Sequence, residues 1–125
     1  MTKLLIVEDQ KVQLEGMVEN LENQGYAILQ ALTGSEAISI IQEQKPEIIL
    51  LDLYLEDMSG LAVLKEAKAL NPKTCVMILT GFDVDTTREK AFQMGADYFL
   101  IKPIPLATLK EYLAEAAKGI MEKNP

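Results

Sequence analysis

Four apolar runs in this sequence end in side chains that could do chemistry together. Two acids, Glu8 and Asp9, follow the first run, and a third acid, Asp52, follows a later one. A hydroxyl and an ammonium end two further runs, at Thr80 and Lys102. Three carboxylates held close together repel one another unless they take up a cation or a proton. Because their oxygens are hard ligands and the chain has no histidine, we expect the cation to be Mg²⁺.

The same residues indicate phosphoryl transfer. With a cation in place, Asp52 is free to act as a nucleophile, a role that carboxylates fill in aspartyl-phosphate chemistry. A phosphoryl group in transfer spreads negative charge over its oxygens and needs cations and donors around it. Lys102 offers an ammonium and Thr80 a hydroxyl, while Gly81 leaves an accessible backbone N–H beside Thr80.

Five short apolar runs alternate with five helical patterns, and this alternation would position those side chains. The runs cover residues 4–7, 26–29, 48–51, 76–79 and 98–101. Short, nearly continuous apolar runs are typical of strands buried on both faces of a parallel sheet.

The helical patterns have recognisable ends. The first carries apolar residues at i, i+3, i+4 and i+7, and we expect Gly25 to cap its C-terminus. Thr33 and Glu36 form a capping box at the start of the second. The other expected helices are 59–71 with Ser59 as its N-cap, 84–94 ahead of Gly95, and one with Pro105 in its first turn.

This element order predicts an α/β fold. Strands that are each followed by a helix pair in parallel through right-handed crossovers. We expect a doubly wound five-stranded parallel sheet in the order 2-1-3-4-5, in which ligands bind beyond the carboxyl ends of the strands. The second strand, at the sheet edge, ends in Gln30 and Ala31 and adds nothing reactive. The chemistry is therefore predicted to gather at one rim of the sheet.

Length, charge and composition limit what the chain can be. Its 125 residues suit one domain, expected over 1–121, with a polar tail or the start of a linker at 122–125. The net charge of −7 argues against direct nucleic-acid binding, which needs clustered Lys and Arg. No apolar run approaches the roughly 20 residues of a membrane span, so we expect no membrane contact. The single cysteine, Cys75, fits a reducing, cytoplasmic compartment.

Four motifs surround the strand ends, in this order over residues 3–118: LLIVED, IILLDLYLEDMSG, VMILTG and GADYFLIKP. They resemble the receiver domains of response regulators in two-component signal transduction. The resemblance implies a flavodoxin-like (βα)5 fold, a bound Mg²⁺ for which Mn²⁺ is a substitute, and a cis bond between Lys102 and Pro103. Many receivers have Asp where this chain has Glu8, a variant that the family tolerates.

The resemblance also implies a role for each matching residue. Asp52 is the phosphoacceptor, and Lys102 pairs with the phosphoryl group. Asp52 shares the metal with the acidic pair Glu8 and Asp9 and with the backbone carbonyl of Tyr54.

A second set of residues would transmit the signal and set the lifetime of the phosphorylated state. Thr80 follows the phosphoryl group, and Phe99 is the switch aromatic that moves inward with it. Partners then read a surface formed by the fourth helix, fifth strand and fifth helix, at about 84–118. Tyr54 and Phe82 would flank the phosphoryl group and slow its hydrolysis.

The implied partners follow from the same resemblance. The chain has no histidine, so it cannot itself be a histidine phosphodonor. The resemblance implies that the donor is a histidine kinase or a histidine phosphotransfer protein. The phosphorylated chain would in turn control an output domain or a target protein. A second copy of the chain is a further expected partner, in a homodimer that forms on phosphorylation. Tyr98 argues against the symmetric dimer of the family's transcription factors, which usually carry Asp at this position. The chain is not expected to be a turnover enzyme.

Three other functions compete with this one. A haloacid-dehalogenase-type enzyme places a second acid two residues after its aspartate, where this chain has Tyr54. A flavodoxin-like carrier would not bind FMN phosphate beside Glu8 and Asp9. A receiver-like docking module that is not phosphorylated remains the alternative. Glu56 and Asp57 are interpreted as solvated loop acids.

Overall fold

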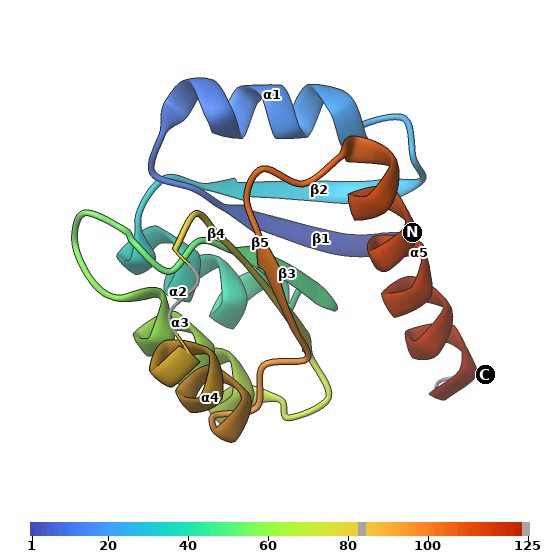
Figure 1. Ribbon diagram of the computed structural model, residues 1–125. Helices are drawn as coiled ribbons and strands as arrows, with labels where there is room; N and C mark the ends of the chain where they lie inside the picture. The colour runs from blue at the N-terminus through green and yellow to red at the C-terminus, as the bar shows by residue number, and fades with distance from the viewer. Residues whose placement is uncertain (83–84, 124–125) are drawn as a thin grey trace.

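Five parallel strands form one sheet, with a helix after each strand (Figure 1). The computed structural model describes residues 1–82 and 85–123. The strands are β1 (Thr2–Val7), β2 (Tyr26–Ala31), β3 (Ile48–Leu51), β4 (Cys75–Thr80) and β5 (Tyr98–Ile101). The helices are α1 (Lys11–Leu21), α2 (Gly34–Gln44), α3 (Gly60–Leu70), α4 (Asp85–Gln93) and α5 (Leu106–Lys123). The order β2-β1-β3-β4-β5 confirms the predicted doubly wound sheet.

Helices cover both faces of the sheet. Figure 1 shows α1 and α5 on one face and α2, α3 and α4 on the other. Because successive strand residues point to opposite faces, each strand contributes to two cores. The core beneath α1 and α5 includes Leu4, Ile6, Leu50, Met77, Leu109 and Leu113. The core beneath the other three helices includes Leu5, Val7, Ile49, Leu51, Val63 and Ile78.

Side-chain caps begin two helices where the sequence predicts them. Thr33 Oγ1 accepts a hydrogen bond from the Glu36 N–H (3.1 Å), and Ser59 Oγ accepts one from the Leu61 N–H (3.1 Å). The Glu36 carboxylate accepts from the Leu32 N–H (3.2 Å), one residue before the usual partner in a capping box. The bonds to Thr33 and Ser59 satisfy N–H groups in the first turns of α2 and α3, which have no partner within their helices.

The predicted end of α1 is wrong. The helix ends at Leu21, and Glu22 caps it in a right-handed conformation. Gly25, with φ of 88°, instead turns the chain into β2, and the left-handed region explains why glycine stands there. Gly95, with φ of 104°, follows α4 closely, as predicted. Val84, the expected first residue of that helix, lies outside the described residues.

Both ends of the last helix differ from the predicted ones. α5 begins at Leu106, and Pro105 precedes it, with the Pro105 carbonyl accepting from the Leu109 N–H (3.0 Å). α5 also continues to Lys123, two residues into the segment expected as a tail. Across the part of the chain that the structure describes, no helix has the length and apolar character needed to cross a membrane.

Tyr98 links β5 to α5, and replacing it with Phe should change how the free energy of unfolding depends on pH. Its hydroxyl donates to Glu115 Oε1 (2.9 Å). Burial, followed by the bond and charge of Glu115, raises the pKa of Tyr98 to about 12 from 10.0. The folded chain thus holds this proton more tightly than the unfolded chain, so the stabilisation is complete below about pH 10 and is lost as pH rises through about 12. The stability advantage of the wild type over Tyr98→Phe should shrink between about pH 8 and pH 11 in urea denaturation. An advantage that is constant across this range would contradict the assignment.

Candidate functional site

Three carboxylates meet at the C-terminal edge of the sheet. Glu8 follows β1 and Asp52 follows β3, and these strands are neighbours, with Val7 opposite Leu51. The Asp52 N–H donates to the Val7 carbonyl (3.1 Å), which extends the pairing one residue beyond β3. One carboxylate oxygen from each of Glu8, Asp9 and Asp52 lies within 4.8 Å of the other two. Glu8 is 1% exposed, whereas Asp9 and Asp52 are half-buried.

Lys102 brings an ammonium to this cluster from the end of β5. Its Nζ lies 2.6 Å from Glu8 Oε1 and 3.0 Å from Asp52 Oδ2. Its backbone N–H donates to the Thr80 carbonyl (2.8 Å), which holds the end of β5 beside β4. The bond to Pro103 is cis, as the resemblance implies. Side chains from both ends of the sequence are therefore in direct contact.

Burial and ion pairing act in opposite directions on the charges of this pocket. Desolvation by burial raises the pKa of Glu8, although the hydrogen bond and charge of Lys102 lower it in part. Burial alone would lower the pKa of Lys102, but its hydrogen bonds to Glu8 and Asp52 and their charges outweigh this, and its pKa is raised. The pocket thus contains one positively charged ammonium group and three carboxyl groups. A divalent cation would balance the charge that remains.

The donor set fits a small, hard cation. Each member of the acidic group offers a carboxylate oxygen, and neither sulfur nor imidazole belongs to it. Mg²⁺ binds oxygen ligands at roughly 2.0–2.1 Å, so oxygens that share one ion must lie close together. Since the oxygens here lie within 4.8 Å of one another, a small side-chain adjustment would bring them to coordination distance. The Tyr54 N–H donates to Asp52 Oδ1 (3.0 Å), so the loop that carries the expected carbonyl ligand folds back over the same carboxylate.

Two aromatic residues come two positions after Asp52 and Thr80, in the segments that follow β3 and β4. Tyr54 and Phe82 form an edge-to-face pair with ring centres 4.7 Å apart, and they are 47% and 59% exposed. The Phe82 N–H donates to Thr80 Oγ1 (3.4 Å), and Thr80 has no exposed surface. The two residues expected to flank a phosphoryl group therefore contact each other, one from the segment after β3 and one from the segment after β4.

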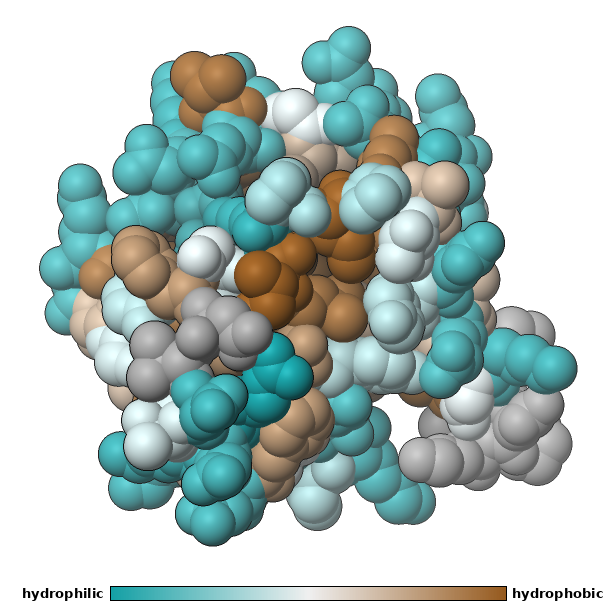
Figure 2. Space-filling model, in the orientation of Figure 1, coloured by the Kyte–Doolittle hydropathy of each residue, from teal (hydrophilic) through white to brown (hydrophobic). Residues whose placement is uncertain are grey.

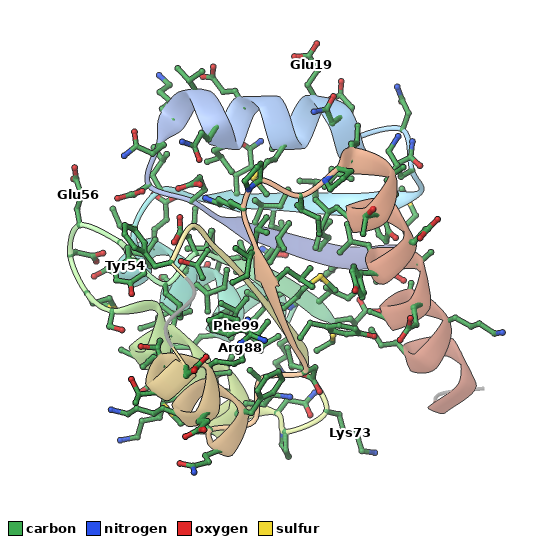
Figure 3. The ribbon with its side chains drawn as sticks, in the orientation of Figure 1. Glu19, Tyr54, Glu56, Lys73, Arg88 and Phe99 are labelled. Carbon is green, nitrogen blue, oxygen red and sulfur yellow. The ribbon has the colours of Figure 1, made fainter. Side chains whose placement is uncertain are left out.

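Phe99 is buried beneath α4. It is 9% exposed, and its ring centre lies 6.4 Å from that of Phe92. The guanidinium carbon of Arg88 lies 5.2 Å from the Phe99 ring centre, a cation–π contact. Figure 3 shows these two side chains together between β5 and α4. The resemblance implies that Phe99 moves inward on activation, but in this structure the ring is already buried, and the sequence did not single out Arg88.

The loop between β3 and α3 holds an acid whose contacts the sequence did not reveal. Asp57 is exposed, as expected, but it is not simply solvated. It accepts hydrogen bonds from the N–H groups of Gly34 (2.8 Å) and Ser35 (2.9 Å) at the start of α2. These partners lie 23 and 22 residues away along the chain, so no local spacing rule could have found them. Glu56, next to it, points outward from the loop (Figure 3).

Known proteins resemble this chain in sequence and in fold. The chain is 34% identical over 113 residues to the transcriptional regulatory protein ZraR of Salmonella typhimurium, an alignment that covers 90% of this chain and 26% of ZraR. A CheY-like response regulator receiver domain protein from Methanospirillum hungatei superimposes with a TM-score of 0.95 at 27% identity, covering 99% of each chain. A response regulator from Burkholderia pseudomallei, solved with a phosphorylated aspartic acid, calcium ion and citrate, superimposes with a TM-score of 0.85 at 30% identity, covering 100% of this chain and 76% of that one. The sequence model described as the response regulator receiver domain matches residues 4–114, and the chain belongs to that family.

Proposed function

We propose that Asp52 accepts a phosphoryl group from a phosphohistidine, with Mg²⁺ held by Glu8, Asp9, Asp52 and the Tyr54 carbonyl. The observation that carries this proposal is the position of Lys102 Nζ, 3.0 Å from Asp52 and 2.6 Å from Glu8 within a group of three acids. The phosphorylated aspartic acid in the Burkholderia regulator supports it. In this proposal the donor is a histidine kinase or a histidine phosphotransfer protein, the donors expected for a receiver domain. The phosphohistidine must lie on that partner, since this chain contains no histidine.

The side chains of the pocket have complementary tasks in such a transfer. An Asp52 oxygen attacks phosphorus, the bond from phosphorus to the donor's imidazole nitrogen breaks, and that nitrogen keeps the electron pair. Bound Mg²⁺ would supply positive charge to the phosphoryl oxygens. Lys102, which bridges Glu8 and Asp52, can turn its ammonium toward a phosphoryl oxygen while it stays near Glu8. The Thr80 hydroxyl accepts from the Phe82 N–H and has its own proton to donate.

Phosphorylation would then shift an existing equilibrium between two arrangements of the region around Phe99. A movement of Thr80 toward the phosphoryl group changes the space behind Phe99 and its contact with Arg88. The surface that partners would read is formed by α4, β5 and α5. Hydrophobic surface gathers near the middle of the face in Figure 2, over β5 and the loop that leads to α5. An output domain, a separate target protein or a second copy of the chain would bind there.

The output of this switch lies with other segments or proteins. The chain spans 26% of the length of ZraR, 49% of the regulator PmrA from Pectobacterium parmentieri and 59% of YdfI from Bacillus subtilis. In this proposal the chain catalyses its own phosphorylation and dephosphorylation and is not a turnover enzyme. The alternative is a docking module that is never phosphorylated.

Acetyl phosphate separates these two functions. With Mg²⁺ present, intact-mass spectrometry should show one phosphoryl group added to each chain. Addition of EDTA should prevent labelling, and Mn²⁺ should restore it, because the group of three acids needs a divalent ion to admit the phosphoryl group. Absence of labelling in saturating Mg²⁺ would favour the docking module.

The rings of Tyr54 and Phe82 should control how long the phosphoryl group persists. Replacing both Tyr54 and Phe82 with Ser removes the pair of rings and opens a path for water, so decay should accelerate about tenfold, or roughly 1.4 kcal/mol in barrier. Decay is measured on gels that resolve the phosphorylated chain after the donor is removed. Leu70→Ser is the matched control, because Leu70 is 53% exposed at the far end of α3. An unchanged decay rate in the double variant would exclude shielding by these rings.

A further inference from the structure

The loop that carries Asp52 is held at its base and at its tip. At the base, the Gly60 N–H donates to the Leu53 carbonyl (2.7 Å), and Tyr54 and Ser59 form an antiparallel bridge. At the tip, Asp57 accepts three hydrogen bonds from the first two residues of α2. They come from the Gly34 N–H (2.8 Å), the Ser35 N–H (2.9 Å) and the Ser35 hydroxyl (2.9 Å).

These bonds make Asp57 a capping residue of a helix that begins 23 residues earlier. The first N–H groups of a helix have no partner within it, and they carry partial positive charge. Thr33 satisfies the Glu36 N–H, and Asp57 satisfies those of Gly34 and Ser35. The backbone bonds from Gly34 and Ser35 hold the pKa of Asp57 below its ordinary value of 3.8, so the cap is charged at neutral pH.

Met58 brings the same loop into very close contact with α2. A Cβ placed on Gly34 would clash with Met58 Cγ and would lie 2.6 Å from its sulfur. The start of α2 therefore leaves no room for a side chain at Gly34 while Met58 stays where it is. Two adjacent loop residues, one polar and one apolar, thus fasten the loop to the helix.

We propose that Asp57 is a positioning residue for the metal site, which holds the Tyr54 carbonyl and the Asp52 carboxylate in place by tying their loop to α2. The inference rests on the proposed function, because it takes Mg²⁺ as the ligand of this site. Without Asp57 the loop samples more conformations, and the apparent affinity falls by the fraction of time in which the binding arrangement is present. Glu56 is the matched control, since it lies on the same loop, carries the same charge and points away from α2 (Figure 3).

The experiment compares wild type, Asp57→Ala, Asp57→Asn and Glu56→Gln. Calorimetric titration with Mg²⁺ gives the dissociation constant, and NMR amide exchange without metal reports on the loop directly. Asp57→Ala should weaken Mg²⁺ binding about three- to tenfold, and should accelerate exchange at Gly34, Ser35 and Tyr54. Asp57→Asn keeps one acceptor oxygen and should lie between Asp57→Ala and wild type. Glu56→Gln should weaken binding less than about twofold and leave exchange at these amides unchanged.

Three other outcomes would contradict either the positioning role of Asp57 or the proposed function. If Glu56→Gln weakens Mg²⁺ binding as much as Asp57→Ala does, the effect is one of net charge, and the positioning role is wrong. If wild type binds Mg²⁺ and both Asp57 variants bind it equally well, the inference fails while the proposed function stands. If wild type does not bind Mg²⁺ at all, the proposed function itself fails. Should Asp57→Ala not fold, Asp57→Asn and Ser35→Ala, each of which removes part of the bonding, decide the question in the same assays.

Discussion

Asp52→Asn is expected to abolish labelling by acetyl phosphate, with a rate at least roughly a thousandfold below that of wild type. An amide oxygen is a far weaker nucleophile than a carboxylate, and the substitution also removes one of the two carboxylates that Lys102 contacts. The amide preserves the shape of the side chain and an oxygen that can accept from the Tyr54 N–H, so the fold should survive. Intact-mass spectrometry over time measures the rate.

Glu56→Gln serves as the control for Asp52→Asn. It removes one negative charge from the same loop but leaves the carboxylates around Lys102 unchanged. This variant should label at close to the wild-type rate. If Asp52→Asn were labelled as quickly as the control, the phosphoryl group would belong on another residue.

Gly60→Ala should have the largest effect on stability, lowering the free energy of unfolding by about 3 kcal/mol. Gly60 begins α3 directly against the loop of the site. A Cβ at this position would lie 2.5 Å from the Asp52 carbonyl oxygen and 2.7 Å from the Leu53 Cα. Both are backbone atoms, so they cannot move aside as a flexible side chain can. Urea denaturation measures the loss, and labelling should slow as well because Asp52 itself must shift.

Gly16→Ala is the control for the added methyl group. Gly16 lies within α1, and a Cβ there would meet nothing within 4 Å. Alanine is the better helix former, so this variant should gain about 0.5–1 kcal/mol. A Gly60→Ala variant as stable as wild type would show that α3 does not press on the loop as described.

The fold and the edge of the sheet that carries the site could be predicted from two simple sequence signals. Continuous apolar runs mark the strands, and apolar residues at helical spacing mark the helices. The runs at 48–51 and 98–101 agree with the observed bounds of β3 and β5, since a continuous apolar run leaves little choice about which residues are buried. Parallel strands place their C-terminal ends at one edge, so the residues after each run could be brought together from the sequence. That reasoning placed Glu8, Asp9 and Asp52 in one group, as the structure does.

The remaining features depend on distances between elements, which no local pattern encodes. Asp57 has the composition of a solvated loop residue, and only the packing of its loop on α2 makes it a cap. The contact of Arg88 with Phe99 likewise depends on how α4 lies against β5. Gly25 misled the prediction of α1 because a glycine near a helix end suggests a cap, whereas here it serves the turn that follows.

The central claim, that residues distant in sequence form one pocket for a divalent ion, is tested most directly with Mn²⁺. Bound Mn²⁺ broadens the NMR signals of nearby amides in a nitrogen-15-labelled chain. The proposal predicts broadening centred on Glu8, Asp9, Asp52 and Tyr54, and its reversal by about millimolar Mg²⁺. Broadening centred elsewhere, or no competition from Mg²⁺ at that concentration, would contradict the proposal.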